Sequence, residues 1–229
     1  MQKRVIVLSL GGSLIIPDEV NVKFLKEFKK TILKNTGKYK FVIVCGGGSI
    51  ARKYISALRN SDTDEELQSL SGISATRMNA RFMTYFFNRD PEYGMPHTIE
   101  TLERYIKKHD VVFCGALEYK PNQTSDSTAA EIARHFKTSF INLTNVQGLH
   151  DKNPKLYKNA IFIPKISWKD FYKMANKTKF KPGQHFVLDQ TASKVILKDK
   201  ITTYLLGKNL KQLDNLLNNR VFKGTIING

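Results

Sequence analysis

Two stretches of the sequence decide its fold: Val5-Ile6-Val7-Leu8-Ser9-Leu10-Gly11-Gly12-Ser13 and Phe41-Val42-Ile43-Val44-Cys45-Gly46-Gly47-Gly48-Ser49. In each stretch a run of apolar residues, rich in β-branched side chains and typical of a buried strand, ends in a cluster of glycines. A glycine turn after a strand lets backbone N–H groups approach an anion without interference from a Cβ atom. The pair of clusters therefore predicts two phosphate sites that converge in space, although either cluster alone would more simply be a tight turn.

The glycine clusters match neither of the two best-known phosphate motifs. No Gly-Lys-Ser/Thr closes them, which excludes a P-loop, and their spacing differs from the dinucleotide-binding fingerprint. The residues after the second cluster have helical spacing, with Ile50, Tyr54 and Leu58 apolar and Arg52 between them. The positive end of that helix would point into the same turn, so the sequence indicates two phosphorylated ligands.

Strand-like and helix-like segments alternate along the chain. The expected strands are 5–8, 41–45, 111–114, 139–143, 161–166, 186–188, 202–206 and 225–227. The expected helices are 22–33, 49–59, 72–88, 98–108, 127–136, 168–175, 191–198 and 210–217, and 145–158 is expected to be a loop. This alternation predicts an α/β fold, with a mostly parallel sheet between layers of helices and ligands at the carboxyl ends of its strands.

Length and charge set broad limits on the protein. With 229 residues and no segment resembling a linker, the chain is predicted to form a single domain over residues 1–229. It carries 37 basic and 20 acidic residues, a net charge of +17 and a pI near 9.8, which indicates attraction to polyanions, nucleotides or acidic surfaces. The basic residues are spread over many segments, so most are expected on the solvated faces of helices.

The cysteines and the apolar segments indicate a cellular compartment. Cys45 and Cys114 end apolar runs and are expected to be buried free thiols, since two isolated cysteines make neither a disulfide framework nor a zinc site. No apolar stretch reaches the roughly 18 residues of a membrane span, and the N-terminus lacks a recognisable leader. We therefore expect a cytoplasmic protein without a membrane partner.

Two further polar groups follow expected strands. Thr124-Ser125-Asp126-Ser127 precedes an alanine-rich helix and is first of all a capping arrangement, although Glu131 is too far along to close a capping box. In the functional alternative, Thr124 and Ser125 donate to a phosphate while Asp126 orients a metal or a lysine. The group Thr144-Asn145-Val146-Gln147-Gly148, taken alone, is a turn.

The order of five motifs resembles that in the amino acid kinase superfamily, and in particular in its archaeal-type UMP kinases. The motifs are the two glycine turns, Gly72-Ile-Ser-Ala-Thr-Arg-Met-Asn-Ala80, Thr124-Ser-Asp126 and Thr144-Asn-Val-Gln-Gly148. The similarity extends from Val5 to Gly224-Thr225-Ile226. It implies a three-layer αβα sandwich that transfers the γ-phosphoryl group of Mg·ATP to UMP, usually as a hexamer. The N-terminal part would hold the acceptor and the C-terminal part ATP.

The resemblance also implies roles for individual positions. It assigns ATP binding to Gly11, Gly12, Ser13, Leu14, Gly48, Arg52, Thr144, Asn145, His150 and Asn153. It assigns UMP binding to Gly47, Ser69, Thr124 and Ser125, and catalysis to Arg52, Lys181 and Asp126. Mg²⁺ would arrive with ATP, and no residue is assigned to a resident metal.

The sequence departs from the family pattern near the expected site. Ser9 stands where many superfamily members have a lysine, and Ser69 stands where a carboxylate usually grips the ribose. In the ATP loop Gln147, His150 and Asn153 replace family residues, while Asp151 is close enough to substitute for one lost carboxylate.

These departures leave an alternative open: a catalytically weakened member that binds nucleotide or RNA as a sensor or assembly partner. The net charge of +17 favours a polyanion. RNA is less favoured than a mononucleotide, because the chain lacks a basic stripe interleaved with aromatic residues.

Overall fold

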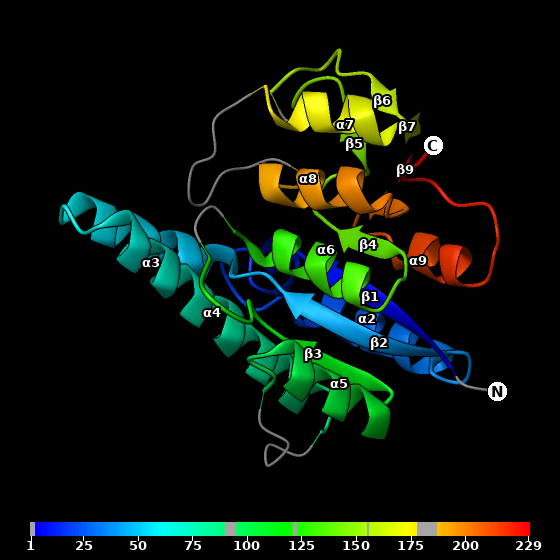
Figure 1. Ribbon diagram of the computed structural model, residues 1–229, viewed down its shortest axis with the longest axis horizontal. Coiled ribbons are helices and arrows are strands. Elements are labelled where there is room, and N and C mark those ends of the chain that lie inside the picture. Colours follow the sequence, from blue (N-terminus) through cyan, green and yellow to red (C-terminus); the bar gives the residue numbers. More distant parts are fainter. Residues whose placement is uncertain (1–2, 90–94, 121–122, 155, 178–186) are drawn as a thin grey trace.

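The computed structural model describes residues 3–89, 95–120, 123–154, 156–177 and 187–229. Its centre is a seven-stranded sheet in the order β3-β2-β1-β4-β8-β9-β7 (Figure 1). The strands are β1 Arg4–Leu10, β2 Tyr39–Cys45, β3 Val111–Cys114, β4 Phe140–Leu143, β7 Lys165–Ile166, β8 Thr203–Leu206 and β9 Thr225–Ile227. All neighbouring pairs are parallel except β8 with β9, so the predicted, mostly parallel sheet is confirmed.

Helices cover both faces of the sheet and give the molecule three layers (Figure 1). They are α1 Gly12–Ile15, α2 Val22–Asn35, α3 Gly48–Asn60, α4 Glu65–Phe86, α5 Ile99–Lys108, α6 Ser125–His135, α7 Trp168–Ala175, α8 Gln190–Asp199 and α9 Leu210–Leu217. One apolar core joins α2, α9 and the second half of α4 to one face, and a second core joins α5, α6, α7 and α8 to the other. Alternate residues of β1 and β2 enter the two cores, which explains why the buried parts of both strands are almost entirely apolar.

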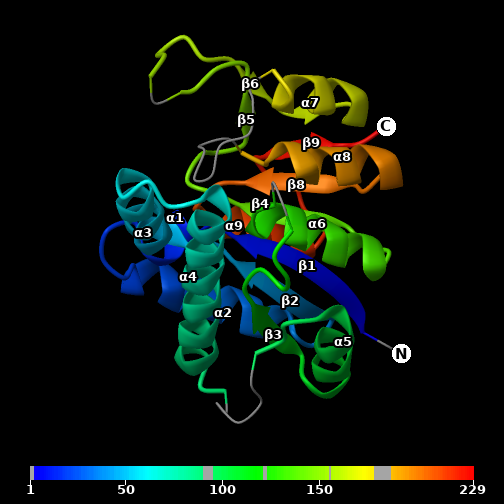
Figure 2. The same cartoon turned by 60° about the vertical axis from the view of Figure 1, so that its left-hand side comes forward.

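The strand order reverses beside β1. The chain runs from β1 outward through β2 to β3, then returns to place β4 on the other side of β1. In open α/β sheets ligands bind where the strand order reverses in this way, outside the carboxyl ends of the strands. Figure 2 shows α3 and α4 rising from the same end of the sheet, beside the turns that follow β1 and β2.

The structure differs from the expected element boundaries in the second half of the chain. The predicted strand over 161–166 is two short strands in different sheets: β6 Phe162–Ile163 pairs with β5 Leu149–His150, and β7 pairs with β9. Pro164 separates them, because proline has no N–H group with which to continue a ladder. Residues 187–188 form no strand, since the Val187 carbonyl accepts a hydrogen bond from the Asn142 side chain at 2.6 Å.

Two helices begin earlier than predicted because of their caps. α4 begins after Asp64, and Glu65 and Glu66 favour the positive end of the helix. α6 begins after Thr124, where Ser127 completes a capping box; Glu131 takes no part in it, as predicted. Cys45 and Cys114 are buried free thiols, as predicted.

Candidate active site

The turns after β1 and β2 meet backbone against backbone. A Cβ atom added to Gly12 would lie 2.0 Å from the backbone nitrogen of Gly48 and 2.7 Å from the carbonyl carbon of Gly46. Gly48 has a φ of +66°, a conformation that residues with a side chain rarely adopt. The two turns therefore converge as the sequence predicts, and the contact between them requires glycine.

Some amides of these turns build the scaffold. The N–H groups of Gly11, Leu14, Gly46 and Ser49 donate to the carbonyls of Leu143, Gly11, Leu10 and Ile16, at distances of 2.9, 2.8, 2.9 and 3.1 Å respectively. The side chain of Leu14 is also buried in the core, with 3% of its surface exposed. Gly11 and Leu14 therefore shape the first turn, and their assignment to the ATP phosphates stays a prediction.

Other amides of the same turns remain available to a ligand. The N–H groups of Gly12, Ser13, Gly47 and Gly48 precede the first helical hydrogen bonds of α1 and α3, and no acceptor for them is found in the described parts of the chain. Amides at the start of a helix, aimed into a crevice, stabilise phosphate oxygens through their partial positive charge. The arrangement can hold two anionic groups side by side, one on each turn.

Neighbouring elements fix the glycine turns in place. The side chain of Asn79, on α4, donates to the Gly46 carbonyl at 2.7 Å from a buried position. The polypeptide after β4 lies against the first turn, because a Cβ atom on Gly11 would lie 3.8 Å from the Cα atom of Thr144. The predicted ATP-loop residue Thr144 thus lies beside the cradle, by which we mean the two glycine turns together. Its N–H group donates to the Leu206 carbonyl at 2.9 Å.

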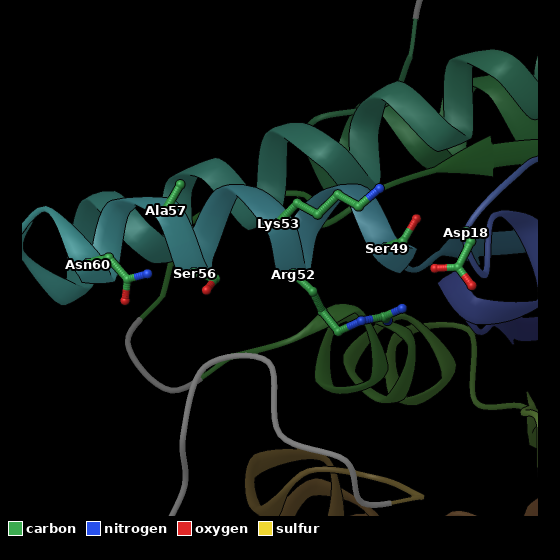
Figure 3. A pocket seen from close by; sticks show the side chains of 7 residues that line it. All are labelled: Asp18, Ser49, Arg52, Lys53, Ser56, Ala57 and Asn60. Atoms are coloured by element: carbon green, nitrogen blue, oxygen red, sulfur yellow. The ribbon is translucent and has the colours of Figure 1, made fainter.

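Arg52 lies one turn into α3, beside an open pocket (Figure 3). The residues that line this pocket are Asp18, Ser49, Arg52, Lys53, Ser56, Ala57 and Asn60. The guanidinium group of Arg52 donates to the Pro17 carbonyl at 3.4 Å and forms no ion pair with a described carboxylate. It is therefore a half-buried cation close in sequence to Gly48, and it can turn toward a phosphate held there.

A buried acidic cluster lies across the end of β1. The hydroxyl group of Ser9, which is fully buried, donates to Asp126 Oδ1 at 2.7 Å. Thr124, the N-cap residue of α6, accepts from the Asp126 N–H at 3.1 Å and donates its own hydroxyl proton to Asp189 Oδ2. The hydroxyl group of Thr124 is therefore bonded to Asp189 in this structure, and its role at a UMP phosphate stays a prediction.

Both carboxylates in this cluster have raised pKa values. Loss of solvent, then the negative charge of Asp189, raises the pKa of Asp126 to about 7, while the hydrogen bond from Ser9 opposes the rise. Burial also raises the pKa of Asp189, although Thr124 and backbone N–H groups donate to its carboxylate. Perturbed carboxylates beside a crevice are typical of functional sites.

On the acceptor side, the structure brings Gly47 next to α4. A Cβ atom on Gly47 would lie 3.5 Å from the Gly72 carbonyl oxygen and 3.6 Å from the Ala75 Cβ atom. Ser69 stands one helical turn before Gly72 on the same helix and is half-buried. Ser125 is the first residue of α6 and is also half-buried.

The remaining predicted ATP residues belong to a separate hairpin or to the loop before it. Asn145 is exposed after β4, and His150 lies in β5, where its ring meets Phe162 with centroids 5.4 Å apart. The Asn153 carbonyl accepts the N–H groups of Leu156 and Tyr157, so this residue shapes the loop between β5 and β6. Lys181 lies outside the described residues.

Three residues with a place in this site were missed from the sequence. Asp189 caps α8 and joins the acidic cluster, and its only sequence signal is a carboxylate directly before a helix. Asn79 supports Gly46, and Arg77 donates from Nε to the Ala116 carbonyl at 3.1 Å and also to the Leu117 carbonyl. Helical periodicity alone does not reveal such long-range contacts.

Neither a metal cluster nor a membrane-spanning helix stands out in the described ranges. Within them, no group of three or more His, Cys, Asp or Glu side chains is arranged to hold a metal ion. None of the described helices combines the length and the apolar character needed to cross a bilayer.

Comparisons with known proteins agree with the fold. The model of the amino acid kinase family matches residues 4–207. A uridylate kinase of Thermoplasma volcanium is 31% identical over 214 residues, covering 93% of this chain and 92% of that protein. A uridylate kinase of Archaeoglobus fulgidus is 32% identical over 202 residues, covering 88% of this chain and 90% of that protein.

Solved structures show the same architecture. The crystal structure of uridylate kinase from Archaeoglobus fulgidus matches with a TM-score of 0.81 and 30% identity, covering 99% of this chain and all of that one. UMP kinase from Ureaplasma parvum shares the fold with a TM-score of 0.79 at 22% identity. Because the family model spans both glycine turns and the acidic cluster, the chain belongs to the amino acid kinase family.

Proposed function

We propose that this protein is a UMP kinase, which transfers the γ-phosphoryl group of Mg·ATP to the phosphate of UMP and releases UDP and ADP. The observation that carries the proposal is the contact between Gly12 and Gly48, which places amides from two turns next to one another. A donor phosphate on the first turn and an acceptor phosphate on the second would lie side by side in the crevice beside β1. Relatives at about 30% identity are named uridylate kinases, which supports UMP as the acceptor.

For this reaction the protein needs mainly to position the phosphates and to neutralise their charge. The acceptor oxygen of UMP is already anionic near neutral pH, so the reaction needs no strong general base. Phosphoryl transfer is accelerated by holding donor and acceptor in line and by cations that stabilise the charge on the transferring group. The amides of Gly12, Ser13, Gly47 and Gly48 would hold the phosphates, and Arg52 would stabilise the transferred group.

Magnesium enters this proposal as part of the Mg·ATP substrate. The cradle consists of backbone amides and offers no ring of carboxylates, a donor set that suits phosphate oxygens better than a bare cation. A metal ion held by the nucleotide would neutralise the phosphates without a protein ligand. We further propose a cytoplasmic homo-oligomer, in keeping with the hexamer that the family resemblance implies.

A coupled assay of ADP release tests the function. Mg·ATP is supplied with UMP, CMP, dUMP or AMP, and we expect saturable turnover that is fastest with UMP. Turnover with none of these acceptors would refute the proposal. The alternative, a weakened member that binds nucleotide or RNA, is not favoured, since the scaffold of the cradle is intact.

A further inference from the structure

Ser9 occupies an unusual position for a neutral side chain. It lies at the carboxyl end of β1, fully buried, two residues before the first glycine turn. Its hydroxyl group donates to Asp126 Oδ1 at 2.7 Å and is the side-chain donor that faces this carboxylate. Asp126 itself is half-buried, so part of its surface remains accessible.

The acidic cluster is short of positive charge in the described parts of the chain. Neither Asp126 nor Asp189 forms an ion pair with a described lysine, arginine or histidine. α6 packs mainly against α8, β1, β2 and β4, and among the titratable groups described on these elements Asp189 is the one whose charge affects the pKa of Asp126. Two neighbouring buried carboxylates that lack a cation cannot both ionise without a large cost.

The hydrogen bonds decide which carboxylate keeps a proton. Asp189 accepts from the Thr124 hydroxyl, from the Ala192 N–H at 2.8 Å, and from the N–H groups of Thr191 and Ser127. These donors all favour its anionic form. Among the described side chains, Ser9 is the one that donates to the Asp126 carboxylate, so the shared proton resides on Asp126.

We propose that Ser9 is a positioning residue for phosphoryl transfer. Its uncharged hydroxyl group forms a hydrogen bond that holds the Asp126 carboxyl group beside the glycine turns. A proton, rather than a cationic side chain, then neutralises one of the two negative charges of the Asp126–Asp189 pair. This inference rests on the proposed kinase function. Phosphates bound on the neighbouring glycine turns disfavour a second negative charge in the cluster. Loss of the Asp126 proton at higher pH should therefore weaken nucleotide binding, and Ser9 sets the pH at which this happens.

The first test needs no catalysis. The Asp126 carboxyl carbon is followed by NMR as pH is raised in the wild type, Ser9→Ala and Ser9→Lys, with Asp126→Asn used to assign the signal. We expect titration near neutral pH in the wild type, a higher midpoint in Ser9→Ala, and a midpoint at least one pH unit lower in Ser9→Lys. A midpoint near 4 in the wild type, or equal midpoints in a folded Ser9→Ala and the wild type, would overturn the inference.

The second test uses turnover and separates the two proposals. We expect Ser9→Ala to shift the pH profile of kcat/KM for Mg·ATP, with a change of about tenfold on the alkaline side. Ser193→Ala is the matched control, because it also removes a buried serine hydroxyl group. This hydroxyl lies on α8 and bonds to the Gln190 carbonyl and the Asn176 side chain, not to the carboxylate of Asp126 or Asp189. Its profile should match the wild type. An active wild type with the same profile in Ser9→Ala would refute the role of Ser9 alone, whereas inactivity of the wild type would refute the kinase function and leave the NMR test standing.

Discussion

The backbones of Gly12 and Gly48 touch across the end of the sheet, although each belongs to the turn after a different strand. This contact is possible because β1 and β2 are adjacent and parallel, in a register that pairs Leu10 with Cys45. The glycines that follow then reach the same height above the sheet. The two glycine turns are therefore in direct backbone contact, and a change in either one moves both.

Replacing Gly12 by alanine should remove activity and lower stability. The new Cβ atom would lie 2.0 Å from the Gly48 nitrogen, and the atoms it meets are backbone, which cannot rotate away. We expect a loss in kcat of about 100-fold or more and a loss of roughly 1–3 kcal/mol in the free energy of unfolding. Gly37→Ala is the control, since nothing lies within 4 Å of its added Cβ atom, and its stability should stay the same or rise. A fully active Gly12→Ala would show that the cradles are not coupled.

Much of this arrangement could be predicted from the sequence, and the reasons are local. The apolar runs ending in glycine identify β1 and β2, and the helical spacing after Gly48 identifies α3. Parallel order then requires both turns to lie at one end of the sheet. The burial of Leu14 was not predicted, because its place in a motif does not reveal which way a short helix turns its side chain.

The acidic cluster could not be predicted for a different reason. Ser9 and Asp126 are 117 residues apart in sequence, and Asp189 joins them from a third element. Periodicity reports the face on which a residue lies but not which distant residue it meets. Ser9 was recognised only as a departure from the family pattern, and its partner became visible once α6 was placed against β1.

Arg52 should be needed for turnover rather than for folding. It forms no ion pair with a described carboxylate, so little stabilisation is lost with its side chain. If it stabilises charge on the transferring group, Arg52→Ala should lower kcat by roughly 100- to 1,000-fold, with thermal stability close to wild type. Lys53→Ala, in the next position and lining the same pocket, is the matched control and should retain most activity. Equal kcat values for Arg52→Ala and the wild type would mark Arg52 as a surface cation.

Replacing Asp126 by asparagine should stabilise the protein at alkaline pH. The pKa of Asp126 is raised from 3.8 to about 7 in the folded state, so the folded protein binds more protons than the unfolded chain between these values. Stability therefore falls as pH rises through that window and stays low above it. Asparagine does not titrate and can still accept the hydrogen bond from Ser9.

Urea unfolding at pH 5 and pH 8 measures this effect. Allowing for the partial exposure of Asp126, we expect Asp126→Asn to gain on the order of 1–2 kcal/mol relative to the wild type between pH 5 and pH 8. The explanation fails if the difference in stability between the two proteins is the same at both pH values.

Replacing His150 should weaken the binding of ATP and leave the binding of UMP unchanged. Its ring lies on β5 against Phe162, in the hairpin that β5 forms with β6. If it stacks on adenine, His150→Ala should raise the KM for ATP by about 10-fold while His150→Phe keeps it near wild type. His97→Ala, which removes a histidine at the start of α5, serves as the control. An equal rise in the KM values for ATP and UMP in His150→Ala would point to a loss of structure rather than of stacking.

Restoring a carboxylate at Ser69 should strengthen binding of the acceptor. Ser69 is half-buried on α4, one turn before Gly72, whose carbonyl lies beside Gly47. A carboxylate accepts hydrogen bonds from ribose hydroxyl groups more strongly than a serine hydroxyl does, so each bond recovered is worth about 1.5–3 kcal/mol. We expect Ser69→Asp to lower the KM for UMP by roughly 10-fold and to leave the KM for ATP unchanged. Ser69→Asn separates charge from size, because it has nearly the same shape and should recover less than half of the gain in binding free energy. If Ser69→Asp leaves UMP affinity as it is, while 2′-deoxy-UMP and UMP are bound equally by both proteins, the ribose does not lie against this turn of α4 and the acceptor binds elsewhere along the crevice.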